Sequence, residues 1–158
     1  MSTITPPPEP PRPLDPDEEA LVRSLVRVIY LLPRALDADL VRDQGLPLVE
    51  YLTLMHLSET PQRLMRMSEL AAACELSLSG MTRVVARLET QGLVRRVKCD
   101  EDARGWNAVL TDAGLDRLAK AWPAHLAGVR RHLLDHLADL DLDLAQLARA
   151  FERIATTE

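Results

Sequence analysis

The segment from Ser77 to Gln91 carries hydroxyl and guanidinium groups on one side of a predicted helix. Its apolar residues recur at three- and four-residue spacing and are expected to face a core: Met81, Val84, Val85 and Leu88. The opposite side presents Ser79, Thr82, Arg83 and Arg87, with Ser77 at the helix start. Hydroxyl groups donate to phosphates, and arginines bind phosphates or guanine edges. This chemistry suits the major groove of a nucleic acid, although the same residue types occur on any solvated helix face.

A β-hairpin predicted after this helix carries a second basic set, namely Arg95, Arg96 and Lys98 in its first strand and Arg104 at its tip. An arginine on a loop can enter the narrow minor groove, where the negative potential of DNA is strongest. Asp102 precedes Arg104 closely enough to order its guanidinium through a bidentate pair. Asp100 and Glu101 oppose phosphate binding. Trp106, behind the tip, is interpreted as strand packing rather than as a wedge between bases.

Two short helices joined by a tight turn are expected before the hairpin. Ser68 is predicted to cap a helix over residues 69–74, and Ser77 to cap the next helix, which runs to residue 91. Gly92 is expected to end that helix in the left-handed conformation. Strands are predicted over residues 93–98 and 106–110. A helix-turn-helix followed by a two-stranded hairpin is a winged helix.

Long leucine-striped helices are predicted on both sides of this region. The first runs over residues 17–45, with a kink at Pro33, and a second over 47–58 is followed by a loop around 60–64. Thr111 is expected to cap a long helix, and Asp141 or Asp143 a last one. Their apolar stripes exceed what a small core can cover, so a second copy of the chain is expected to bury them.

The predicted fold is therefore mostly α with a small β-hairpin wing, a winged helix-turn-helix that dimerises through its N- and C-terminal helices. Four regions follow from it: a disordered Pro-rich tail (1–16), an N-terminal dimerisation helix (17–45), the DNA-binding region (46–111) and C-terminal dimerisation helices (112–158). Seven of the eleven prolines lie between Pro6 and Pro16, where regular structure is disfavoured. A partner-binding polyproline segment is the alternative to a passive tail.

Charge is distributed unevenly along the chain. The net charge is −5, which by itself argues against a nucleic-acid partner. Residues 62–106, however, hold eight basic and six acidic residues, a net charge of +2, whereas the remainder holds eleven basic and eighteen acidic residues, a net charge of −7. The basic middle of the chain is thus the region that suits DNA.

Several short motifs resemble, in order and spacing, the MarR family of bacterial transcriptional regulators. They are Ser68-Glu69-Leu70-Ala71, the run from Ser79 to Glu89, Gly92-Leu93-Val94, Asp102-Ala103-Arg104 and Leu110-Thr111-Asp112-Ala113-Gly114. The resemblance implies a homodimer whose winged-helix lobes bind a pseudo-palindromic site in double-stranded DNA. It also implies repression of nearby genes, relieved when a small aromatic molecule binds between the dimer base and the lobes. The residues expected to contact DNA or order the contact are Ser77, Ser79, Thr82, Arg83, Arg87, Lys98, Asp102 and Arg104.

Three other groups of residues admit a functional and an ordinary interpretation. Tyr51, Met55, Trp122 and His125 could form a small-molecule pocket or belong to the core. His125, His132 and His136 share one face of the predicted helix and could bind a metal, although satisfied or solvent-facing histidines are the ordinary case. Cys99 at the wing could sense oxidants, although its acidic neighbours disfavour a thiolate; Cys74 is expected in the core.

The remaining observations exclude other classes of protein. No phosphate-binding loop, catalytic triad or paired carboxylate motif is present, so no catalytic residue and no cofactor or metal site is predicted. With two cysteines, a disulfide framework is not expected. The charge-free stretches are too short to span a membrane, and no secretory signal is recognised, so a cytoplasmic location is predicted. The rival function is a winged helix that binds proteins rather than DNA.

Overall fold

The computed structural model describes residues 11–99 and 105–156 of the chain. The chain divides into two compact units, Met1–Leu31 and Leu32–Glu158. The boundary lies within the first helix, α1 (Pro16–Gln44), which continues through Pro33 without a break. The Asp15 carboxylate accepts hydrogen bonds from the backbone N–H groups of Asp17 and Glu18, at 3.0 and 2.9 Å, so it caps this helix.

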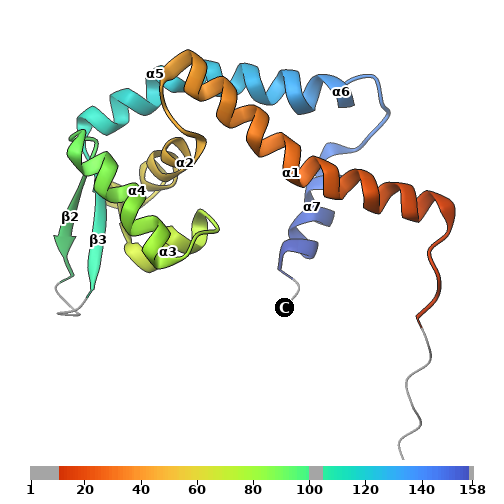
Figure 1. Cartoon of the computed structure of the whole chain (residues 1–158), viewed down its shortest axis with the longest axis horizontal. Helices are drawn as coiled ribbons and strands as arrows, with labels where there is room; N and C mark the ends of the chain where they lie inside the picture. Colours follow the sequence, from red (N-terminus) through yellow and green to blue (C-terminus); the bar gives the residue numbers. More distant parts are fainter. Residues whose placement is uncertain (1–10, 100–104, 157–158) are drawn as a thin grey trace, which may run out of the picture. The chain divides into compact units, whose positions relative to one another are not determined.

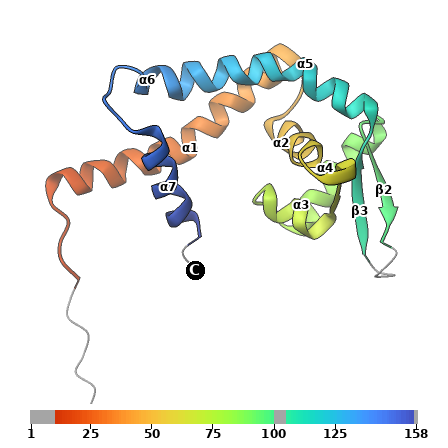
Figure 2. The same cartoon turned by 180° about the vertical axis from the view of Figure 1, so that it is seen from behind.

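The second unit contains the remaining helices and all the strands. The helices are α2 (Leu48–Ser58), the 3₁₀ turn η1 (Pro61–Arg63), α3 (Met67–Ala73), α4 (Leu78–Thr90), α5 (Asp112–Val129), the π-helical segment η2 (Arg130–Leu134), α6 (Asp135–Leu137) and α7 (Leu144–Ala155). The strands are β1 (Leu64–Arg66), β2 (Val94–Lys98) and β3 (Trp106–Leu110). Figures 1 and 2 show α2, α3 and α4 gathered beside the hairpin formed by β2 and β3, which we call the wing, and α5 leading away from it. The fold is mostly helical with a small antiparallel sheet, as the sequence predicts.

The sheet has three strands in the order β1-β3-β2, one more than the predicted hairpin. Residues around 60–64 were expected to form only a loop, but Leu64 pairs with Val109 and Arg66 with Asn107. In the wing, Val94 pairs with Leu110 and Lys98 with Trp106. A strand of only three residues has no recognisable periodicity of its own, so its pairing depends on β3, which is distant in the sequence.

The core lies where α2, α3 and α4 meet the sheet. All four residues predicted to face inward from α4 are buried: Met81, Val84, Val85 and Leu88. They pack with Leu54, Leu57 and Leu70 from α2 and α3. Because this face of α4 is held in the core, its opposite face is turned toward solvent.

One local prediction is wrong and another is incomplete. Ser68 does not cap α3, because that helix begins at Met67 and its N-cap residue is Arg66, which makes no side-chain capping hydrogen bond. The helix after Thr111 is not α-helical to its end, because η2 adopts π-helical hydrogen bonding. This changes the phase of the side chains that follow Val129.

The junction between the wing and α5 is built by Thr111 and Gly114. The Thr111 hydroxyl accepts a hydrogen bond from the Gly114 N–H at 3.0 Å, capping α5, and donates to the Gly92 carbonyl at 2.7 Å. A Cβ at Gly114 would lie 2.1 Å from the Leu93 carbonyl oxygen. Only glycine therefore permits α5 to approach Leu93, the residue just before the wing, so closely.

Within the described residues, no helix combines the length and the apolar character that crossing a lipid bilayer requires.

Candidate nucleic-acid interface

Helix α4 begins at a side-chain cap that the sequence predicts correctly. The Ser77 hydroxyl accepts a hydrogen bond from the Gly80 N–H at 3.1 Å and lies 3.1 Å from the Ser79 hydroxyl. Gly92, with φ of +72°, follows the end of the helix in the left-handed conformation that glycine tolerates. The two ends of α4 are thus fixed by residues outside its buried face.

The exposed face of α4 carries the predicted DNA-contacting residues Ser79, Thr82 and Arg83. The Thr82 hydroxyl donates to the Leu78 carbonyl at 2.8 Å, so its proton is already used within the helix. Arg83 forms no ion pair with any described residue. Arg83 is therefore the cation on this face that is available for an anionic partner.

Arg87 lies on the same helix, but its guanidinium is held by the protein. Its Nε donates to Glu50 Oε1 at 2.8 Å, and the Glu50 side chain is only 5% exposed whereas that of Arg87 is 53% exposed. Glu50 was missed by the sequence reasoning. A lone acid among the apolar residues of α2 was the available signal, because a buried carboxylate requires a cation.

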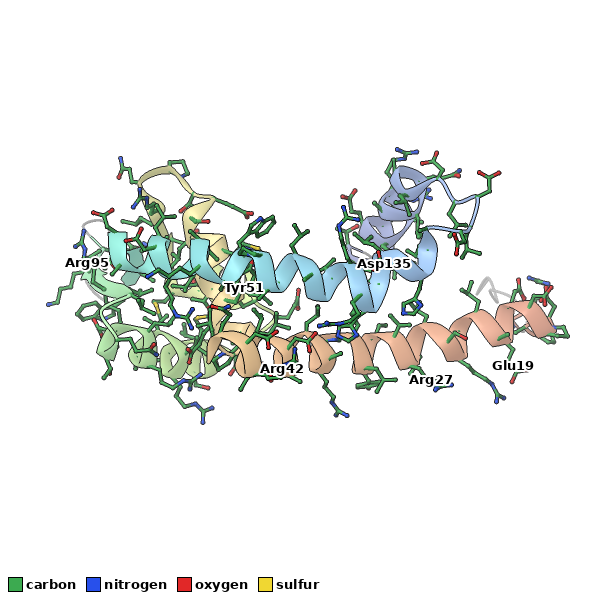
Figure 3. The ribbon with its side chains drawn as sticks, turned by 90° about the horizontal axis from the view of Figure 1, so that it is seen from above. Glu19, Arg27, Arg42, Tyr51, Arg95 and Asp135 are labelled. Carbon is green, nitrogen blue, oxygen red and sulfur yellow. The ribbon has the colours of Figure 1, made fainter. Side chains whose placement is uncertain are left out.

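The wing carries its basic residues on both faces. Successive side chains of a strand point to opposite sides, so Arg95 lies on the other face from Arg96 and Lys98. Arg95 and Lys98 are exposed, and Figure 3 shows Arg95 projecting from the wing. Asp102 and Arg104, the residues expected at the wing tip, lie outside the described residues, so their predicted roles stay predictions.

Arg96 links the wing to α4. The Glu89 carboxylate accepts from the Arg96 backbone N–H at 3.1 Å and from its Nε at 2.9 Å, and this pairing lowers the pKa of Glu89. The Arg96 guanidinium lies 6.0 Å from the centre of the Trp106 ring. The ion pair holds the wing at a fixed place beside α4.

The four residues considered for a small-molecule pocket fall in one region of the second unit. Tyr51 is fully buried, and its ring stacks on His125 with ring centres 4.3 Å apart. The ring centres of Trp122 and His125 lie 6.3 Å apart, and Trp122 is half exposed, while Met55 is partly buried against the core. Figure 3 shows Tyr51 beside α5.

Burial controls the protonation of the two stacked rings. It raises the pKa of Tyr51 to about 12 and lowers the pKa of His125. The Tyr51 hydroxyl and His125 Nδ1 are buried and form no hydrogen bond with any described residue. The cluster therefore offers two unused polar atoms beside aromatic surface.

The three histidines, which lie on α5, η2 and α6, have different surroundings. His125 stacks on Tyr51, His136 is exposed, and His132 Nε2 lies 2.7 Å from Asp39 Oδ2. Arg131 and Arg42 also bind the Asp39 carboxylate. The hydrogen bond with His132 contributes most, and together these bonds hold the pKa of Asp39 well below its usual range. Among the described residues, no three His, Cys, Asp or Glu side chains are placed to hold a metal ion.

The two cysteines also differ. Cys74 packs against the core, as predicted, and burial raises the pKa of its thiol. Cys99 is half-buried, and its sulfur accepts a hydrogen bond from Arg66 Nη2 at 3.2 Å.

A sequence model of the MarR family matches residues 44–105. The chain is 38% identical to Sco3205, a MarR family transcriptional regulator from Streptomyces coelicolor solved in complex with DNA; the match covers 92% of this chain and 89% of that one, with a TM-score of 0.79. It is 40% identical to AbsC, another MarR family transcriptional regulator from Streptomyces coelicolor, over 92% of this chain and 96% of that one, with a TM-score of 0.79. The transcriptional regulator BldR from Sulfolobus solfataricus shares the fold at 21% identity, with 89% and 95% of the two chains covered and a TM-score of 0.74. No curated protein matches the sequence.

Proposed function

Because the chain belongs to the MarR family, we propose that it is a transcriptional repressor that binds a pseudo-palindromic DNA site as a homodimer and is released by a small aromatic molecule. The family membership makes the chain a transcriptional regulator rather than an enzyme. DNA binding is supported by the relative that was solved in complex with DNA. Repression, dimerisation and ligand release are the finer parts of the proposal.

One observation carries the DNA-binding role. The exposed face of α4 presents hydroxyls and Arg83, which forms no ion pair with a described residue, and the wing beside it adds the exposed Lys98 and, on its other face, Arg95. Glu89, the acid near the end of this helix, is already bound to Arg96. A positively charged face made of a helix and an adjacent hairpin matches the phosphate backbone and the grooves of duplex DNA.

The proposed roles follow from this placement. Arg83 and the exposed part of Arg87 contact the major groove and nearby phosphates, while Ser77, Ser79 and Thr82 lie along the DNA backbone. Thr82 would donate to a phosphate by exchanging its hydrogen bond to the Leu78 carbonyl. Lys98 neutralises a phosphate from the wing. Arg104, ordered by Asp102, enters the minor groove. Two-fold symmetry then requires the two α4 helices to lie about one helical turn of DNA, roughly 34 Å, apart.

The aromatic cluster is the proposed effector site. An aromatic molecule with a hydroxyl or carboxylate would find ring surface on Trp122 and His125, with Met55 at its side. The unused polar atoms of Tyr51 and His125 would receive its hydrogen bonds. Tyr51 follows Glu50, the residue that binds Arg87 of α4. A ligand that shifts α2 would therefore move Glu50 and, through Arg87, the DNA-facing helix α4.

Selection of DNA by the purified protein tests the proposal. We expect it to enrich a two-fold symmetric sequence from randomised 30-base-pair duplexes and to lose affinity steeply as salt rises, because DNA binding releases counterions. Replacing Arg104 by alanine should weaken binding and reduce the salt slope by about two, one for each subunit of the proposed dimer. A protein that enriches no duplex at low salt is instead an adaptor for other proteins.

A further inference from the structure

Trp106 is exposed to a degree that strand packing does not explain. It keeps 45% of its surface accessible at the start of β3, and Leu78, at the start of α4, keeps 55%. Both side chains border a cleft of about 360 Å³ between α3, α4 and the wing. Large apolar side chains that border an exposed cleft together are a signature of a binding surface.

The cleft combines apolar and cationic groups. Its lining includes Arg66, Ser68, Leu78, Thr82, Arg96 and Trp106. Of the described residues that line it, none is acidic. Arg66 and Arg96 supply guanidinium groups, that of Arg96 also paired with Glu89, and Ser68 supplies an exposed hydroxyl. This composition suits an anionic ligand that also carries an apolar surface.

Trp106 and Arg96 are held in place before any ligand arrives. Glu89 binds Arg96 through both its Nε, at 2.9 Å, and its Nη2, at 2.7 Å, and so fixes the plane of the guanidinium. That guanidinium lies over the Trp106 ring at 6.0 Å. A side chain that is already ordered loses little conformational freedom on binding, so its contacts translate into affinity.

The place of the cleft identifies the ligand. It lies between α4, the element proposed for the major groove, and the wing, the element proposed for the minor groove. Neighbouring grooves of a duplex are separated by one sugar-phosphate strand. Whenever α4 and the wing occupy adjacent grooves, that strand must therefore pass over the cleft.

We propose that this cleft binds the sugar-phosphate strand between the two grooves, with Trp106 packed against a deoxyribose and Arg96 bound to an adjacent phosphate. The inference rests on the proposed DNA binding and adds to it a contact outside α4 and the wing tip. Glu89 is then a positioning residue for Arg96. Because sugar and phosphate are common to all sequences, the contact strengthens binding without reading bases.

Two variants with different chemistry test the cleft. With the duplex that the parent protein selects, Trp106→Ala should weaken binding about tenfold and leave the salt slope unchanged, since the lost contact is apolar. Arg96→Gln should weaken binding and reduce the salt slope by about two, because each subunit of the proposed dimer loses one phosphate contact. Arg12→Gln, which removes an exposed arginine from the segment before α1, outside the cleft, should leave both unchanged.

A second measurement guards against loss of folding. The difference in acrylamide quenching between the parent and Trp106→Phe reports the accessibility of the Trp106 indole, and the duplex should reduce it. Affinities within a factor of two of the parent in folded variants, or an indole as accessible with DNA as without it, would overturn the inference and leave the proposed function standing. A parent protein that selects no duplex would overturn both.

Discussion

The guanidinium of Arg87 is shared between the protein interior and the surface proposed to face DNA. Its Nε binds the buried Glu50 carboxylate, while more than half of its side chain remains accessible. Removal of one partner of a buried pair leaves the other charge without compensation. The two partners differ in burial, so the cost should depend strongly on which of them is removed.

We therefore expect Arg87→Gln to destabilise the protein by about 3 kcal/mol, because it leaves Glu50 charged and buried. Glu50→Gln should cost about 1 kcal/mol, because the Arg87 left behind reaches water. Urea denaturation of both single variants and of the double variant measures these losses. The double variant should regain most of the stability that Arg87→Gln loses, because it no longer holds a buried charge at Glu50. Equal losses in both single variants would contradict the asymmetry.

The double variant also separates the two roles of Arg87. If Arg87 only ties α4 to α2, the double variant should bind the selected duplex like Glu50→Gln. If Arg87 also contacts DNA, as proposed, the double variant should bind more weakly and with a smaller salt slope.

His125 makes stability depend on pH in a predictable direction. Burial lowers its pKa in the folded protein below the value of about 6.5 that an unfolded histidine has. The unfolded state therefore binds more protons, and stability is complete above about pH 6.5 and declines as the pH falls below it. The Tm should thus fall from about pH 7.5 to about pH 5.5, and it should fall less in His125→Phe, which keeps the ring stack but cannot titrate. An identical decline in both proteins would show that other groups cause it.

At the scale of elements, the close packing of α5 on the wing depends on Gly114. An added Cβ would meet the Leu93 carbonyl oxygen at 2.1 Å and Leu110 Cδ1 at 2.5 Å, contacts that backbone and core cannot both relieve. Gly114→Ala should cost about 3 kcal/mol or more, although alanine favours helices. Thermal unfolding checks this, with Ala113→Gly at the neighbouring exposed position as a control that should cost about 1 kcal/mol. A Gly114→Ala protein as stable as the parent would mean that α5 can shift away freely.

The elements that were predicted from the sequence are those with signals inside their own segments. The four apolar residues of α4, the caps Ser77 and Thr111, and Gly92 each act within a few residues, and the structure confirms them. β1 was missed because its hydrogen bonds are made to β3, which is distant in the sequence. For the same reason sequence reasoning placed Arg87 on the DNA-facing side but could not find Glu50, which lies on another helix.

In the wing, too, local features could be predicted from the sequence and contacts with other elements could not. Its basic residues and strand bounds could be read from the sequence, because both are local. That Arg96 is bound by Glu89 and that Trp106 remains half exposed depend on how the wing sits against α4. Such contacts between elements decide which arginines are available for DNA.

At the scale of the whole molecule, large apolar side chains are exposed in both units of the described chain. In the first unit, the exposed apolar residues of α1 include Leu21, Val22, Val26, Ile29 and Tyr30. In the second unit, the region of α7 exposes Leu140, Leu142, Leu144, Phe151 and Ile154. Burial of such surface against a second copy is the favourable term that would drive the proposed dimer.

A charge on the apolar face of α7 should disrupt the proposed dimer. Ile154 is 63% exposed, and Ile154→Glu places a charge in an interface that is proposed to be apolar. The variant should shift from dimer to monomer in sedimentation equilibrium at micromolar concentration. Gln146→Glu adds the same charge at an exposed position near the start of α7 and should remain dimeric.

The loss of the dimer should then appear in DNA binding, although Ile154 lies far along the chain from α4 and the wing. Two linked lobes bind two half-sites with an effective concentration that raises affinity by a factor of about 100 or more over one lobe. Ile154→Glu should therefore bind the selected duplex at least about 100-fold more weakly, with a salt slope near half that of the parent, because each monomer neutralises half the phosphates. A parent protein that sediments as a monomer, or an Ile154→Glu monomer that binds with the full affinity and slope, would contradict the two-fold mode of binding.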